Sequence, residues 1–158
     1  MTEPRRPPSR FPWPPVIYLA AIVASIVLNL FYPLPWIGEP LSDMLVATGW
    51  VLLAGVAAID FSAMRTLWRA KTTIMPHRVS EHLVTSGAFS FTRNPIYLAN
   101  TLLVIAVGLI SEIAWFLPLA LLAAFITQKL AIEREERHLD QHFGKRYRDY
   151  AKRVRRWI

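Results

Sequence analysis

The segment HLVTSGAFSFTRNPIYLAN, residues His82 to Asn100, separates two pairs of apolar stretches in a chain of 158 residues. It is polar, it contains Gly87, Arg93 and Pro95, and it runs directly into the third apolar stretch. Gly87 permits a turn that a side chain would obstruct, and Pro95 suits the first turn of a helix, where its missing N–H costs nothing. Arg93 then precedes a helix N-terminus, a combination that suits a carboxylate or phosphate. An arginine that merely extends toward lipid headgroups is the alternative interpretation.

The apolar residues indicate a membrane protein. They make up 54% of the chain and form long runs, which is more than a small soluble domain can bury. The runs are residues 16–32, 44–64, 96–110 and 113–128. The first two are near the length that crosses a hydrocarbon core of about 30 Å, whereas the last two form a short hairpin that just crosses or dips deeply. We therefore expect an all-α integral membrane protein with about four transmembrane helices.

The chain divides into three parts by composition. Residues 1–15 are basic and rich in proline, so we expect them to be disordered. Residues 16–64 form a two-helix membrane anchor, and residues 65–158 hold the polar segment, a helical hairpin over residues 95–128 and a charged C-terminal region. Cysteine is absent, which excludes a disulfide framework and a thiolate metal site.

The distribution of charge predicts the topology. If the N-terminus is cytoplasmic, all 18 Lys and Arg residues fall on the cytoplasmic side and the two external connections carry none, which is the positive-inside pattern. Both termini are then cytoplasmic. The net charge of +7 is explained mostly by topology, so nucleic-acid binding becomes a weak alternative, whereas anionic lipids would be attracted to the basic side.

The C-terminal region offers a partner for Arg93 on the same side of the membrane. One face of its helix carries residues four, three and four positions apart, namely Ile132, Glu136, Leu139 and Phe143. Glu136 thus lies within an apolar stripe, where a carboxylate requires a partner. Glu133 and Glu135 lie progressively off its centre, and Glu133 is interpreted as part of a solvated, salt-bridged face. After Gly144 an amphipathic helix with Tyr147, Tyr150, Val154 and Trp157 lies on the membrane or folds back over the site.

Two motifs now carry a family resemblance. The first is LVTSG followed by RNPIY in residues 83–97, and the second is EREERHLDQHFGKRYRDYAKRVRRWI in residues 133–158. In this order, over residues 73–158, they resemble the catalytic half of the isoprenylcysteine carboxyl methyltransferase and phospholipid methyltransferase superfamily. Ala88 stands where proline is usual, Ala99 where many members have glycine, and Asn94 where histidine is commoner, which argues against a general base at that position.

The resemblance implies an enzyme that transfers a methyl group from S-adenosylmethionine, bound at the cytoplasmic edge, to a lipophilic acceptor arriving from the bilayer. Residues 65–158 would then be the catalytic half, in a bacterial cell membrane. The resemblance implies that Arg93 and Glu136 are catalytic. The residues implied to bind the cofactor are His82, Leu83, Val84, Gly87, Phe89, Arg93, Asn94, Pro95, Tyr97, Glu135 and Glu136.

The acceptor remains open, because two kinds fit the motifs. A carboxylate of the isoprenylcysteine type would be ionised and would be oriented by Arg93, whereas a phospholipid amine would need to lose a proton to Glu136, His77 or His82. Methyl transfer from a sulfonium needs alignment and desolvation, but no metal and no covalent intermediate.

Other functions are alternatives of lower standing. His138 and His142 are four positions apart, but without a third ligand we expect no metal site. One alternative is a non-catalytic membrane scaffold with the same fold. Another is a small transporter that uses Asp60 and Asn29. The sequence does not indicate the oligomeric state.

Overall fold

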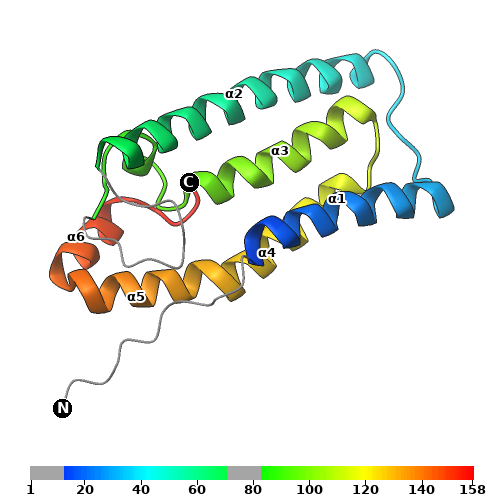
Figure 1. Ribbon diagram of the computed structural model, residues 1–158. Coiled ribbons are helices and arrows are strands. Elements are labelled where there is room, and N and C mark those ends of the chain that lie inside the picture. The colour runs from blue at the N-terminus through cyan, green and yellow to red at the C-terminus, as the bar shows by residue number, and fades with distance from the viewer. Residues whose placement is uncertain (1–12, 71–82) are drawn as a thin grey trace.

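The computed structural model describes residues 13–70 and 83–158, and the regular structure in these two stretches is entirely helical (Figure 1). The helices are α1 (Trp13–Phe31), α2 (Leu41–Arg69), α3 (Pro95–Ser111), α4 (Phe116–Thr127), α5 (Glu133–Phe143) and α6 (Lys145–Arg153), with a 3₁₀ turn η1 (Gly87–Ser90) and a π-helical segment η2 (Gln128–Ile132). The predicted all-α fold is confirmed. Residues 1–12 and 71–82, which include His77 and His82, lie outside the described residues.

Two helices extend beyond their predicted ends. Residues 13–15 were predicted to be disordered, but they form the first turn of α1. Pro14 and Pro15 are compatible with this position because the first N–H groups of a helix have no partner within it. Helix α2 continues to Arg69 without a break, so the predicted boundary after residue 64 falls inside a helix.

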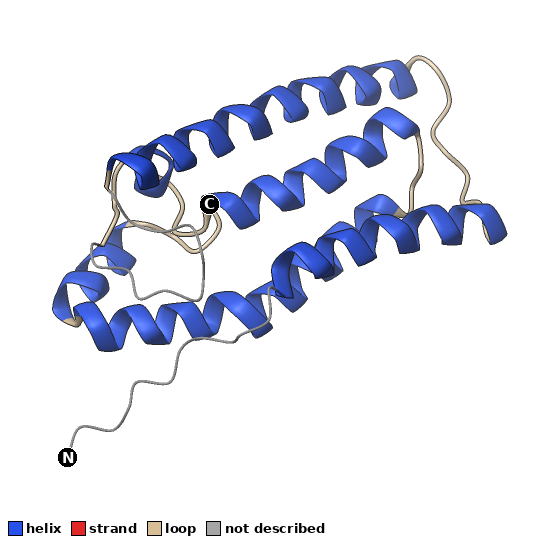
Figure 2. Ribbon diagram, viewed as in Figure 1, coloured by secondary structure: helices blue, strands red, loops and turns tan. Residues whose placement is uncertain are grey.

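Among the described residues, three helical stretches are long and apolar enough to cross a membrane, namely Pro14–Phe31, Leu41–Arg69 and Phe116–Phe143. The last is one helical stretch in which α4 passes through η2 into α5, as Figure 2 shows. Helix α3 is shorter, with 17 residues, and is also apolar. It forms the predicted hairpin with α4.

Close helix contacts hold the bundle together. Helix α2 packs along α3, and α1 packs along α4 (Figure 1). A Cβ on Gly49 of α2 would stand 2.8 Å from Cγ1 of Ile110 and 3.0 Å from the carbonyl oxygen of Ala106, so the absence of a side chain there permits the close approach of α3. A Cβ on Gly108 would overlap Phe116 in the same way. These contacts set how α3 lies against α2 and α4.

The two ends of the bundle differ in charge. The acidic residues at one end are Glu39, Asp43 and Glu112, close to the turns that join α1 to α2 and α3 to α4. The described Lys and Arg residues lie at the other end, in the last turns of α2, just before α3, and from η2 onward. This arrangement is the one that the positive-inside pattern predicts.

Candidate active site at the basic end of the bundle

Arg93 is fixed by the chain turn that starts α3. Pro95 occupies the first helical position, and the hydroxyl of Thr92 accepts a hydrogen bond from the main-chain N–H of Asn94 at 3.2 Å. The Arg93 side chain is 15% exposed, and its Nη2 lies 3.2 Å from Oε1 of Glu136. Its Nη1 donates to the Tyr147 hydroxyl at 3.3 Å. Its Nε is buried and has no hydrogen-bond partner among the described residues.

Glu136 lies between two guanidinium groups. Arg156 binds both of its oxygens, through Nε to Oε1 at 3.0 Å and Nη2 to Oε2 at 2.6 Å. This bidentate geometry is the strongest form of an arginine–carboxylate pair. Arg93 makes the longer, single contact. The predicted pairing of Arg93 with Glu136 is present, but the sequence did not predict that Arg156 shares the same carboxylate.

Tyr97 and Glu135 form a second link between the two motifs. The Tyr97 hydroxyl donates to Oε1 of Glu135 at 2.7 Å. Glu135 therefore faces the first turn of α3, whereas Glu136 faces Arg93 and the C-terminus. Glu133 forms ion pairs with Lys129 at 2.7 Å and with Arg156 at 3.9 Å, in keeping with its interpretation as part of a salt-bridged face.

The residues after α6, Val154 to Trp157, form a C-terminal strap that crosses the start of α3. Helix α6 ends at Arg153 rather than continuing to Trp157 as predicted, because Val154 has an extended backbone. The carbonyl of Arg156 accepts hydrogen bonds from the Thr92 hydroxyl at 3.2 Å and from the Asn94 side-chain amide at 3.0 Å. The Arg93 N–H donates to the Arg155 carbonyl at 3.0 Å.

The strap also reaches η2, where Trp157 Nε1 donates to Oε1 of Gln128 at 2.8 Å. Through its hydrogen bond to the Arg156 carbonyl, the Asn94 side-chain amide fixes the strap to the start of α3. Histidine is commoner at this position in the proteins that the motifs resemble.

A small aromatic cluster joins α6 to the segment before η1. It contains Tyr147, Tyr150 and Val154, with Leu83 packed against it. The Tyr150 hydroxyl donates to the Phe89 carbonyl at 2.7 Å. Burial raises the pKa of Tyr150 to about 12 and also raises the pKa of Tyr147, so both hydroxyls stay protonated at neutral pH. Of the two predicted placements, α6 thus folds back over the site.

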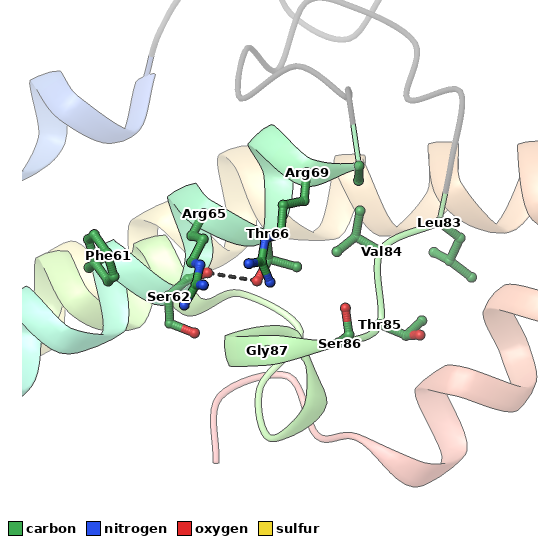
Figure 3. A pocket seen from close by; sticks show the side chains of 11 residues that line it. Phe61, Ser62, Arg65, Thr66, Arg69, Leu83, Val84, Thr85, Ser86 and Gly87 are labelled. Atoms are coloured by element: carbon green, nitrogen blue, oxygen red, sulfur yellow. Dashed lines mark hydrogen bonds between the residues drawn. The ribbon is translucent and has the colours of Figure 1, made fainter.

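A cavity of about 620 Å³ opens beside this cluster, between the end of α2 and residues 83–87 (Figure 3). Leu83, Val84 and Gly87, which the sequence predicted to line a pocket, are on its wall. Gly87 has a φ of +62°, and a Cβ there would overlap the Thr66 hydroxyl. Leu83 contacts both the cavity and the aromatic cluster, and so connects the cavity wall to Tyr147.

The opposite wall of the cavity was not predicted. It is formed by α2, which was interpreted only as a membrane anchor, and its lining residues are Phe61, Ser62, Arg65, Thr66, Arg69 and Ala70. The spacing of Ser62, Thr66 and Arg69 by four and three positions places them on one helix face. That pattern was available in the sequence, but nothing in it indicated that this face meets residues 83–87.

Other residues singled out in the sequence have structural positions. Ala88 and Ala99, where the family often has proline and glycine, are 1% and 0% exposed. The rings of His138 and His142 stack in parallel with centroids 6.4 Å apart. Within residues 13–70 and 83–158, no group of three or more His, Cys, Asp or Glu side chains is arranged to hold a metal ion.

The sequence around this site identifies the protein family of the chain. Residues 44–146 match the model of the phospholipid methyltransferase family. The chain belongs to this family. The matched range contains the first motif, residues 83–97, the beginning of the second motif with Glu135 and Glu136, and most of α2, whose end forms one wall of the cavity.

Relatives of this family member include two proteins named for metal resistance. The chain is 30% identical over 104 residues to the nickel-cobalt-cadmium resistance protein NccN of Alcaligenes xylosoxydans xylosoxydans. It is 28% identical over 135 residues to the cobalt-zinc-cadmium resistance protein CzcN of Cupriavidus metallidurans. The alignments cover 66% and 84% of this chain but 47% and 58% of the relatives. The chain therefore spans about half the length of these curated relatives.

A solved structure shares the fold. The eukaryotic intramembrane Ras methyltransferase, isoprenylcysteine carboxyl methyltransferase, matches with a TM-score of 0.67 at 22% sequence identity. The match covers 95% of this chain and 53% of that one. This likeness shows that the chain shares the fold of that membrane protein. The resemblance inferred from the two motifs is thereby confirmed at the level of family and fold.

Proposed function

We propose that this protein is a membrane methyltransferase that uses S-adenosylmethionine and methylates a lipophilic acceptor at the cytoplasmic membrane face. The observation that carries the proposal is the meeting of the two motifs, through Arg93 to Glu136 at 3.2 Å and Tyr97 to Glu135 at 2.7 Å. These residues lie 38 or more positions apart in the sequence. Membership in the phospholipid methyltransferase family supports the same conclusion.

The residues present fit S-adenosylmethionine. The cofactor has a carboxylate, an ammonium group and a nucleoside, and it supplies an activated methyl group on a sulfonium. Arg93 Nε is a buried donor without a partner among the described residues, and it suits the carboxylate. The cavity beside Leu83 and Gly87, whose lining residues do not include Arg93, lies within the usual size of small-molecule sites, roughly 300–1,000 Å³.

The protein's own contribution is orientation and exclusion of water. Arg93 is held on one side by Glu136 and on the other by Tyr147, so its direction is set before a ligand binds. Tyr97 orients the Glu135 carboxylate. Arg93 and Glu136 are each only 15% exposed, and this partial removal from water strengthens the electrostatic interaction between them.

We infer that a carboxylate acceptor of the isoprenylcysteine type fits the site better than a phospholipid amine. Both oxygens of Glu136 are occupied by arginine donors, which lowers its ability to accept a proton from an amine. Glu135 has one oxygen bound by Tyr97, and so it is the better candidate for a base if the acceptor is an amine. Replacing Glu135 by Gln would then abolish transfer to amines, whereas transfer to carboxylates would fall only about as much as in a variant that lacks the Tyr97 contact to Glu135.

The orientation in the membrane belongs to the same proposal. We place the basic end, with the candidate site and both termini, in the cytoplasm of a bacterial cell. The separation of basic residues from Glu39, Asp43 and Glu112 supports this placement. Labelling of single cysteines introduced near Glu39 and Glu112 by an impermeant reagent in intact cells would test it.

Calorimetric titration of the detergent-purified protein with S-adenosylmethionine tests the proposal. We expect binding to the wild type and weaker binding to Arg93→Ala and Glu136→Ala. Arg148→Ala is a matched control, because Arg148 pairs with Asp140 on the exposed surface. Absence of binding to the wild type would refute the proposed cofactor, and retention of folded protein with no binding would favour a non-catalytic scaffold.

A further inference from the structure

Arg156 is joined to both motifs at once. Its carbonyl accepts hydrogen bonds from Thr92 and Asn94, which flank Arg93. Its guanidinium binds Glu136 through two hydrogen bonds of 3.0 and 2.6 Å. The main chain of Arg156 is thus fixed to the start of α3, and its side chain to α5.

The contacts of Glu136 are divided unequally between its two arginine neighbours. Arg156 has the bidentate interaction, and Arg93 has a single contact at 3.2 Å. A buried carboxylate takes the nearest guanidinium available, because leaving it unpaired is costly. If Arg156 did not occupy both oxygens, Arg93 could turn and form the bidentate pair itself. In the side-on form of that pair, which Arg156 now makes through Nε and Nη2, the Nε donor of Arg93 would be used by Glu136.

From this geometry we infer that Arg156 is a positioning residue: by occupying the Glu136 carboxylate, it keeps the Arg93 Nε donor free for an anionic group of a ligand. The ligand in question rests on the proposed function and is the carboxylate of S-adenosylmethionine. Arg156 itself acts through Glu136 and Arg93.

The first test needs no cofactor. In ¹⁵N-labelled protein in detergent micelles, the Arg93 Nε–H signal is identified by its loss in Arg93→Lys. We expect this signal to shift, and its hydrogen exchange to slow, in Arg156→Gln, because Nε gains the Glu136 carboxylate as an acceptor. Arg153→Gln removes an equal charge from an exposed side chain whose Nε hydrogen-bonds to the main chain of its own helix, and it should leave the signal unchanged. An unchanged signal in Arg156→Gln would overturn the inference.

The second test is a double-mutant cycle on the dissociation constant of S-adenosylmethionine. We expect Arg156→Gln to weaken binding about tenfold, the usual effect of losing one charge-assisted hydrogen bond. Arg156→Lys keeps the charge without the bidentate fork, and should recover part of this loss. Because Arg156 acts through Glu136, the double variant Glu136→Gln/Arg156→Gln should bind much more tightly than the product of the two single effects predicts.

The results separate this inference from the proposed function. Wild-type protein that does not bind S-adenosylmethionine refutes the proposed function, whereas the Arg93 signal in the cofactor-free protein still decides the role of Arg156. If the wild type binds S-adenosylmethionine, two results refute the positioning role alone. One is an Arg156→Gln variant that binds equally well, and the other is a double variant whose loss of affinity equals the product of the two single losses.

Discussion

Replacing Gly87 by Ala should destabilise the protein through two separable effects. Gly87 has a φ of +62°, and for an alanine this left-handed backbone costs about 1–2 kcal/mol. The new Cβ would also overlap the hydroxyl of Thr66, and inserting a methyl group into a filled space costs about 1–3 kcal/mol. We therefore expect the free energy of unfolding to fall by about 2–5 kcal/mol in Gly87→Ala.

Equilibrium unfolding in mixed micelles with rising sodium dodecyl sulfate, followed by circular dichroism, measures this change. Thr66→Ala removes the overlapping oxygen, so the double variant Thr66→Ala/Gly87→Ala should recover the steric part and retain the backbone part. Gly144 has a φ of +53° and a ψ of −122° but nothing within 4 Å of an added Cβ, so Gly144→Ala should lose only a backbone contribution of its own, which Thr66→Ala does not recover. A Gly87→Ala variant as stable as the wild type, or no recovery in the double variant, would refute the reasoning.

Three further predictions, which use four substitutions, test the packing and the site. Gly49→Ala should destabilise the protein by about 1–3 kcal/mol through the α2–α3 contact, whereas Gly55→Ala, at an open helical position, should stabilise the protein by about 0.5–1 kcal/mol. Unfolding in mixed micelles measures both changes. Equal effects of the two substitutions would contradict the account. Tyr97→Phe removes the donor to Glu135, and should lower the methyl-transfer rate about tenfold or more while the protein stays folded; an unchanged rate would count against this contact. Burial raises the pKa of Tyr150 from 10.0 to about 12, so the stability that protonated Tyr150 contributes below pH 10 should be lost as the pH rises from 10 to 12. In Tyr150→Phe the free energy of unfolding should therefore depend less on pH between 10 and 12. An equally steep dependence in this variant would exclude Tyr150 as the cause.

The membrane helices and one ion pair were accessible from the sequence. Helical periodicity placed Glu136 within the stripe of Ile132 and Leu139, and the charge distribution placed Arg93 on the same side. In the structure Ile132 is fully buried and Arg93 contacts Glu136. Local rules sufficed here, because both residues belong to regular helices or to the turn directly before one.

The contacts that depend on long-range packing were not accessible. The predicted stripe describes only one side of α5, and Glu135 lies on a different side. Tyr97 of α3 reaches Glu135 on that side. Arg156 lies in an extended strap, where helical periodicity has no meaning. The wall of the cavity at Ser62 and Thr66 required the packing of α2 against residues 83–87, which no motif records.

Transfer of a labelled methyl group tests the central claim most directly. The purified protein is incubated with S-adenosylmethionine labelled in the methyl group and a total lipid extract, and the label in the organic phase is counted. We predict that the wild type incorporates label into a lipophilic product, that Arg93→Ala abolishes this incorporation, and that Arg148→Ala leaves it unchanged. The assay is repeated with an isoprenylcysteine compound as acceptor. The account would be contradicted if wild-type protein that binds the cofactor transferred no label above background to either acceptor.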